Sequence, residues 1–233
     1  MNMDQDNYSK ILKEFESKAS LKQAIYRNTT EVFGLLKKQL FKVAARLQND
    51  YSAKDPSVEV HFKENSKFEA ELKFSGDMLM VSMHSNVFTF DESSSMCQTK
   101  YIKEDESLAY CGAIYIHNFL ADSVKYNRLA DEGSLIARIL VNKDMHFIVE
   151  GEGALDFLYQ DMARNIVTEE KLTDIIERSI LFCLNADLIL PPFSEIKDVT
   201  LNQKQSMLAA SGYPTSKNLG YQFKAEIAQN KDI

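Results

Sequence analysis

Glu71 and Lys73 form the pair of residues with the clearest potential for chemistry in this sequence. They lie in the stretch FEAELKF, residues 68–74, where apolar and polar side chains alternate as in a strand with one buried face. Residues i and i+2 of a strand point to the same side, so the carboxylate and the ammonium group face the same way. Together with a second acid such as Asp55 or Glu59, they could hold Mg²⁺ or Mn²⁺ and stabilise charge that develops during hydrolysis.

The segment around this pair resembles the start of the PD-(D/E)xK nuclease core, in which a leading helix precedes a three-stranded meander. The resemblance covers residues 20–84 and implies a metal-dependent nuclease in which Glu59, Glu71 and Lys73 are catalytic. The sequence departs from that family in two respects. The aspartate and the proline stand in reversed order at positions 55 and 56, and further strands are predicted where the family continues with a helix.

A purely structural role explains the same charges, and it is the interpretation we favour. Residues 58–63 and 68–74 are predicted to pair as a hairpin with one apolar face and one solvent-exposed face. The predicted register sets Glu59 opposite Lys73, His61 opposite Glu71, and Lys63 opposite Glu69. Opposite charges that face each other across strands contribute about 0.2–1 kcal/mol per pair, so the exposed face is expected to be a set of paired charges.

The polar stretch DSVKYNRLADEG, residues 122–133, is the best candidate for contacts with a ligand. It lies between two hydrophobic segments, where a loop at the edge of a sheet is expected, and loops often carry binding residues. Its candidate ligand-binding residues are Lys125, Tyr126, Asn127, Arg128 and Asp131. The alternative is a connector that contacts no ligand.

The long N-terminal helix offers two further surfaces. Its basic patch consists of Lys37, Lys38, Lys42 and Arg46. This patch either meets an acidic partner or is the solvated face of an amphipathic helix. The apolar residues of the same helix recur every three or four positions between Leu21 and Leu47, which suits packing on a sheet and also suits a homodimer face.

No metal ion or cofactor is expected from the sequence. The four histidines, at positions 61, 84, 117 and 146, fall singly in predicted strands and lack the close spacing typical of metal ligands. The three cysteines, at positions 97, 111 and 183, include no CxxC pair and are expected to be free thiols in a reducing cytoplasm. No G-x-S-x-G motif supports a hydrolase triad.

The bulk composition is that of an ordinary globular domain. The 233 residues are 45% hydrophobic and 26% charged, which allows a sizeable core. The formal net charge of −7 gives no general attraction to nucleic acid or to an anionic membrane, and it disfavours both as partners. The polar start MNMDQDNYSK does not resemble a signal peptide, and no run approaches the ~18 apolar residues of a membrane span, so a cytoplasmic location is expected.

Hydrophobic periodicity predicts a single α+β domain over residues 1–233, with an antiparallel sheet of hairpins between N-terminal and C-terminal helices. Residues 1–50 are predicted to form two helices, 8–17 and 20–49, with Ser20 and Gln23 as a capping box. Gly34 is predicted to mark a break or a close crossing. The sheet is predicted at 57–150, the C-terminal helices at 153–211 with the first at 153–166, and a tail at 213–233.

These observations favour a cytoplasmic, non-catalytic binding protein whose partner is another protein or a small molecule. A homodimer through the long helix is one form of that interaction. The alternative is a metal-dependent nuclease that uses the E-x-K pair of the first hairpin.

Overall fold

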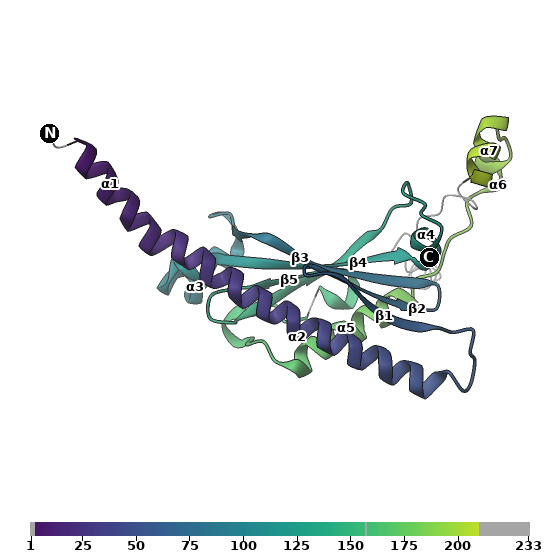
Figure 1. Ribbon diagram of the computed structural model, residues 1–233, viewed down its shortest axis with the longest axis horizontal. Coiled ribbons are helices and arrows are strands. Elements are labelled where there is room, and N and C mark those ends of the chain that lie inside the picture. The colour runs from purple at the N-terminus through teal and green to yellow at the C-terminus, as the bar shows by residue number, and fades with distance from the viewer. Residues whose placement is uncertain (1–2, 157, 210–233) are drawn as a thin grey trace, which may run out of the picture.

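Six antiparallel strands form the sheet at the centre of the molecule, with helices before and after it in the chain (Figure 1). The strands are β1 Val60–Ser66, β2 Glu69–Phe74, β3 Asp77–Thr89, β4 Tyr110–Leu120, β5 Ser134–Val141 and β6 Phe147–Gly151. Their order in the sheet is their order in the chain. This computed structural model describes residues 3–156 and 158–209, and it confirms the α+β class. The tail predicted at 213–233 lies outside the described residues.

The N-terminal helix is one rod and not two helices. The α-helix α1 Met3–Glu14, the π-helical turn η1 Phe15–Ala19 and the α-helix α2 Ser20–Tyr51 follow one another without a break. At 1.5 Å per residue the rod is about 70 Å long, and its first part projects away from the sheet (Figure 1). The predicted capping box is wrong, because Ser20 has helical backbone angles and its hydroxyl donates to the carbonyl oxygen of Phe15 at 2.8 Å.

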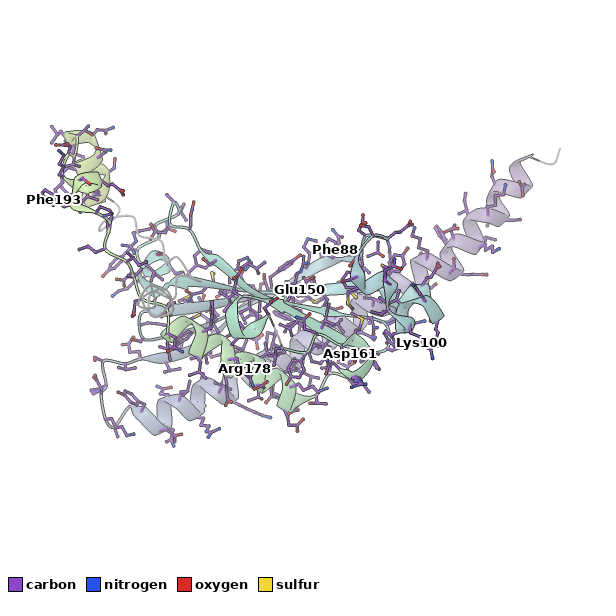
Figure 2. All side chains as sticks on the ribbon, turned by 180° about the vertical axis from the view of Figure 1, so that it is seen from behind. Phe88, Lys100, Glu150, Asp161, Arg178 and Phe193 are labelled. Carbon is purple, nitrogen blue, oxygen red and sulfur yellow. The ribbon has the colours of Figure 1, made fainter. Side chains whose placement is uncertain are left out.

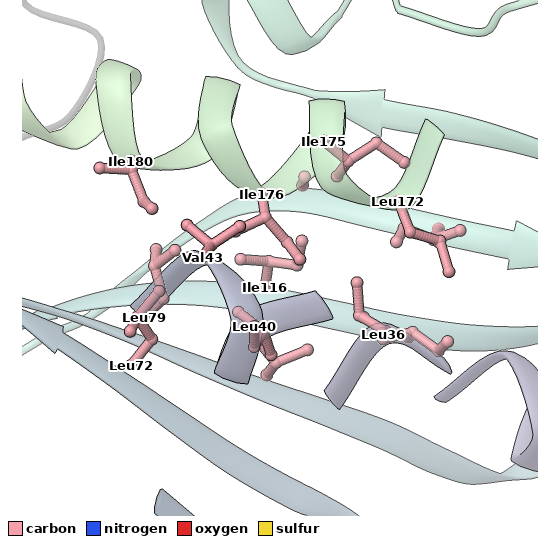
Figure 3. Close-up of a cluster of buried hydrophobic side chains, with 14 of the residues drawn as sticks. Leu36, Leu40, Val43, Leu72, Leu79, Ile116, Leu172, Ile175, Ile176 and Ile180 are labelled. Atoms are coloured by element: carbon pink, nitrogen blue, oxygen red, sulfur yellow. The ribbon is translucent and has the colours of Figure 1, made fainter. Parts of the chain in front are cut away.

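The core lies between one face of the sheet and the helices α2 and α5 Glu169–Leu184. Both helices present an apolar side to this space, and they pack against each other there (Figure 3). Fully buried members from the helices and strands include Leu36, Leu40, Leu72, Leu79, Ile116, Leu172 and Ile175. The predicted alternation in the strands is confirmed on this face, since every second residue of β2 is buried.

Helix α2 approaches the sheet closely at Gly112 on β4. A Cβ atom at this position would lie 1.9 Å from Oγ1 of Thr29 on α2, so only glycine allows the helix to sit at its present distance. Gly34, by contrast, has no atom within 4 Å of where its Cβ would be, and α2 continues through it. Neither the break nor the close crossing predicted at Gly34 is present.

The basic patch of α2 has acidic partners within the chain. Lys38 and Lys42 bind the carboxylate of Glu169 with N–O distances of 3.3 and 2.8 Å, and Lys37 binds Glu64 at 2.6 Å. Glu169 lies in the first turn of α5, where the helix dipole also favours a negative charge. The hydrogen bond from Lys42, reinforced by Lys38, lowers the pKa of Glu169 from its ordinary value of 4.5 to about 2.

Glu169→Gln is expected to make the free energy of unfolding less dependent on pH in the acidic range. A carboxyl group whose pKa is lowered on folding stabilises the folded state above pH 4.5, and this contribution disappears as the pH falls toward 2. The variant should therefore be less stable than wild type at neutral pH and lose less stability on acidification. Urea denaturation across this range measures both effects. Glu177→Gln on the same helix, where the ion pair with Arg46 is 3.9 Å long, is the control and should retain the wild-type pH dependence.

The helix predicted at 153–166 is wrong. In the described residues of this segment, 153–156 and 158–166, the helical structure is limited to two short 3-10 turns, η4 Gly153–Leu155 and η5 Met162–Arg164, and Tyr159 has a left-handed backbone. Its apolar side chains belong to opposite faces of the sheet, since Leu155 joins the core under α2 whereas Met162 joins the cluster on the other face. Leu155 and Met162 therefore do not share one helical face.

The other face of the sheet is covered only in part. The 3-10 turn η2 Ser95–Gln98, the helix α3 Lys100–Glu104 and the 3-10 turn η3 Glu106–Ala109 pack over one region of it. Figure 2 shows Phe88 and Glu150 near the centre of the molecule, and Phe193, on the short helix α6 Phe193–Ile196, at the end opposite α1. The helix α7 Leu201–Ala209 follows, close to the predicted helix at 200–211. Among the described helices, none has the length and hydropathy needed to cross a bilayer.

Candidate functional site

The E-x-K pair lies on β2, on the face of the sheet away from α2, and its strand partners differ from the predicted ones. His61 pairs with Lys73 and Lys63 pairs with Glu71, which is a shift of two residues from the predicted register. A two-residue shift leaves each side chain on its original face, so the apolar pattern does not distinguish the two registers. The predicted contact between Glu59 and Lys73 is nevertheless present, with an N–O distance of 2.5 Å.

The two members of the pair contact different neighbours. Glu71 accepts a hydrogen bond from Asn65 at 2.8 Å and forms an ion pair with Lys63 at 3.5 Å. The hydrogen bond from Lys73 lowers the pKa of the Glu59 carboxyl group. In the described part of the chain, no group of three or more His, Cys, Asp or Glu residues is arranged to hold a metal ion. The nuclease interpretation stays a prediction from sequence, and no contact of this site favours it over a set of paired surface charges.

Lys73 also belongs to a pocket of about 530 Å³ at the end of the β2–β3 hairpin. The antiparallel pairing of β3 with β4 sets Asp77 opposite Leu120, so the turn before β3 meets the residues that follow β4. The amide of Ala121 donates to the carbonyl oxygen of Gly76 at 2.8 Å and joins the two segments. These residues and the short helix α4 Ala121–Lys125 form the walls of the pocket.

The predicted loop supplies two cations to the same pocket. Lys125 and Arg128 line it, whereas Tyr126 and Asn127 are not among the lining residues. Asn127 has a left-handed backbone, with φ of 52°, and makes the turn that follows α4. Of the five residues predicted to contact a ligand, Lys125 and Arg128 line this pocket.

Asp131 has a supporting position behind the pocket. Its carboxylate is 1% exposed, lies 2.9 Å from Nε of Arg128, and accepts a hydrogen bond from the Ser123 hydroxyl at 2.5 Å. The backbone amide of Arg128 donates to the carbonyl oxygen of Ser123 at 2.8 Å, so the loop is closed on itself. A buried ion pair with added hydrogen bonds holds the guanidinium in one orientation. Arg128 is thereby fixed before any ligand arrives.

The lining of the pocket combines positive charge with apolar surface. Three cations, Lys73, Lys125 and Arg128, and one acid, Asp122, line the pocket. Lys73 and Arg128 are also paired with Glu59 and Asp131, at 2.5 and 2.9 Å, so part of their charge is balanced within the chain. The apolar part of the lining consists of Met78, Leu120, Ala121, Val124 and Leu188. Lysine and arginine side chains only donate hydrogen bonds, so the polar groups of a ligand that contacts them must be hydrogen-bond acceptors. The arrangement suits a small organic anion with an apolar portion.

The four histidines are dispersed, and two of them belong to a row of rings on the partly covered face. The row runs Phe88, His84, Tyr115, His117. The centroids of successive rings are 4.7, 6.3 and 6.2 Å apart, in that order. Burial lowers the pKa of His117. His146 lies elsewhere, where its Nδ1 is 2.8 Å from the carbonyl oxygen of Met162.

The three cysteines are free thiols, as predicted. Burial raises the pKa of Cys111 to about 12, so its thiol is protonated and unreactive near neutral pH. Cys111 therefore contributes packing and not nucleophilic chemistry.

No protein-family model matches this chain, and neither a curated protein nor a solved structure matches it. Functional inference therefore rests on the geometry of the pocket.

Proposed function

We propose that this chain is a non-catalytic binding protein whose ligand is a small organic anion held in the pocket at the end of the β2–β3 hairpin. The observation that carries the proposal is the convergence of Lys73, Lys125 and Arg128, from two segments about 50 residues apart in sequence, on one cavity of about 530 Å³. Neither segment alone would supply all three side chains, and because Lys73 and Arg128 are paired with Glu59 and Asp131, Lys125 is the main charge that attracts an anion. The free thiols suit a reducing compartment such as the cytoplasm.

Because the chain as a whole is acidic, local cations determine where an anion can bind. The chain carries a formal net charge of −7, so an anion is repelled by most of the molecule and is attracted only where cations are concentrated. The apolar wall beside the cations favours an organic anion over inorganic phosphate, because burial of apolar ligand surface adds to the charge interaction. A carboxylate or a phosphate monoester attached to a ring or a short alkyl chain has both properties.

Benzoate, benzyl phosphate and the neutral isostere benzamide are suitable probes for isothermal titration calorimetry. The two anions are expected to bind the wild-type chain, and benzamide is expected to bind far more weakly. A charge-assisted hydrogen bond is worth about 1.5–3 kcal/mol, so Lys125→Gln should weaken anion binding by roughly ten- to a hundredfold. Failure of both anions to bind at millimolar concentration would contradict the proposal.

Lys54→Gln is the matched control for Lys125→Gln. Both ammonium groups lie over a neighbouring tyrosine ring, at 5.7 Å for Lys54 with Tyr51 and 5.0 Å for Lys125 with Tyr126, but only Lys125 lines the pocket. The control should bind the anions as wild type does. Equal losses in both variants would indicate a general charge effect and would remove the support for this pocket.

A further inference from the structure

A second pocket, of about 200 Å³, lies on the partly covered face of the sheet and is here named the ring pocket. It shares no lining residue with the pocket at the end of the β2–β3 hairpin. Residues that pair across strands project from the same side of a sheet, so their side chains converge on one region. The cross-strand pairs that line the ring pocket are Phe88 with Cys111, Ala113 with Leu140, and Tyr115 with Arg138.

Side-chain size along β4 explains why a pocket is present at this place. Alternate residues of a strand point to the same face, and on this face β4 presents Cys111 and Ala113 before the much larger Tyr115. Cys111 and Ala113 are 2% and 1% exposed and form the floor of the pocket. The rings of Phe88 and Tyr115 rise beside these two short side chains, and the space between them is the pocket.

Aromatic rings form much of the wall. Phe88, Phe90 and Tyr115 all line the pocket, and Phe88 is 40% exposed, which leaves its ring accessible to a ligand. Aromatic rings favour other rings in edge-to-face or offset contact and gain from it beyond the area that they bury. A cavity of about 150 Å³ with apolar walls is large enough for benzene. The ring pocket therefore suits a molecule of one or two fused rings with small substituents.

The charge of Arg138 is balanced within the chain. Among the described residues that line the pocket it is the one that carries a charge, and it pairs across the strands with Glu150 on β6. Its Nε donates to Oε2 of Glu150 at 2.6 Å, and its Nη2 contacts the same oxygen. A charged ligand would lose hydration here without gaining a free counter-ion, whereas a neutral ring can stack on the flat guanidinium.

We propose that the ring pocket binds a small, neutral and weakly polar aromatic molecule, for which indole is the model compound. The bound ring is buried against Cys111 and Ala113 and contacts the aromatic rings of the wall. A primary amide, as in benzamide, would lose several hydrogen bonds to water among these apolar side chains, so it suits the pocket less well than indole does. This site is additional to the anion site, since the two pockets have no residue in common.

A fluorescence titration of indole with the full chain tests the proposal. The chain contains no tryptophan, so excitation at the red edge of tyrosine absorption reports on the added indole alone. Wild type is expected to give a saturable rise in anisotropy and an emission shift to shorter wavelength, because the bound ring leaves water. Absence of saturable binding at millimolar indole would overturn the proposal.

Phe88→Ala should weaken indole binding by roughly two- to tenfold, the value of one aromatic contact. Phe41→Ala is the matched control, because Phe41 is also exposed, at 57%, but does not line the pocket. It should bind indole as wild type does. Ala113→Leu fills the floor of the pocket and, in a variant that circular dichroism shows to be folded, should abolish measurable binding. Unchanged affinity in Phe88→Ala, or equal losses in Phe88→Ala and Phe41→Ala, would contradict the assignment of the site.

Variants of the two pockets separate this proposal from the proposed function. Lys125→Gln should bind indole as wild type does, and Phe88→Ala should bind benzyl phosphate as wild type does. Loss of indole binding in Lys125→Gln would place indole in the other pocket and overturn this inference. Indoleacetate, measured in Lys125→Gln, should bind more weakly than indole. Tighter binding of this anion would show that Arg138 attracts charge despite Glu150, and it would contradict a neutral ligand.

Discussion

Phe33→Ala is expected to lower the free energy of unfolding by about 3–5 kcal/mol, the range for removing a large aromatic side chain from a packed core. Phe33 is 1% exposed and belongs to the core cluster between α2, α5 and the sheet. The alanine variant loses the burial of the ring and leaves a cavity that the surrounding helices and strands can only partly close. Urea denaturation followed by far-ultraviolet circular dichroism measures the loss, since the chain contains no tryptophan to serve as a fluorescent probe.

Phe41→Ala is the matched control for this effect. Phe41 lies on the same helix and has the same side chain, but it is 57% exposed and touches Phe62 only edge to face, with ring centroids 6.0 Å apart. Its removal should cost well under half as much as removal of Phe33. Similar losses in the two variants would mean that helix propensity or an effect on the denatured state, and not the core, determines the result.

Gly112→Val is expected to destabilise the fold by about 1–3 kcal/mol, the typical cost of overpacking a filled interior. The new Cβ would lie 1.9 Å from Oγ1 and 2.8 Å from both Cβ and Cγ2 of Thr29, so α2 must move away from β4. That displacement disturbs the whole contact between the helix and the sheet. Thermal denaturation and urea denaturation of the purified variant both measure the loss.

Thr29→Ala in the same chain should recover part of the stability lost in Gly112→Val. The alanine removes the two Thr29 atoms that extend beyond Cβ, including the hydroxyl that donates to the carbonyl oxygen of Ile25 at 2.8 Å. Two substitutions in contact are expected to be non-additive, and the coupling energy reports the steric conflict directly. Strictly additive losses would contradict the steric explanation. They would indicate that the backbone conformation at position 112 requires glycine, whatever the side chain at position 29.

The pattern of apolar residues predicted the sheet well but could not determine its register. Alternation with a period of two identifies the buried face of β2 correctly, because burial of every second residue is what produces the pattern. Registers that differ by two residues bury the same side chains. The predicted pairing of His61 with Glu71 was wrong for this reason, and the irregularity between Glu64 and Ser66 near the turn could not be read from residue types.

The candidate pocket was predictable in its parts and not as a whole. The polar stretch that contains Lys125 and Arg128 stands out between two hydrophobic segments, and Lys73 stands out in its motif. What joins them is the pairing of Asp77 with Leu120, a long-range contact for which neither stretch carries a signal. Asp131, which was predicted to contact a ligand, pairs with Arg128, and residue types alone do not show that a buried guanidinium lies beside this carboxylate.

The sequential order of the strands has a consequence for how the chain folds. Each strand finds its partner next to it in the sequence, so the sheet can grow strand by strand, with connections that range from two residues between β2 and β3 to 20 residues between β3 and β4. The contact of α2 with α5 is different, because the ion pair between Lys42 and Glu169 joins residues 127 positions apart. Loop-closure entropy rises with the length of the loop, so we expect docking of α5 to follow pairing of the strands. Until that step, the apolar face of a nearly complete sheet is covered by α2 alone.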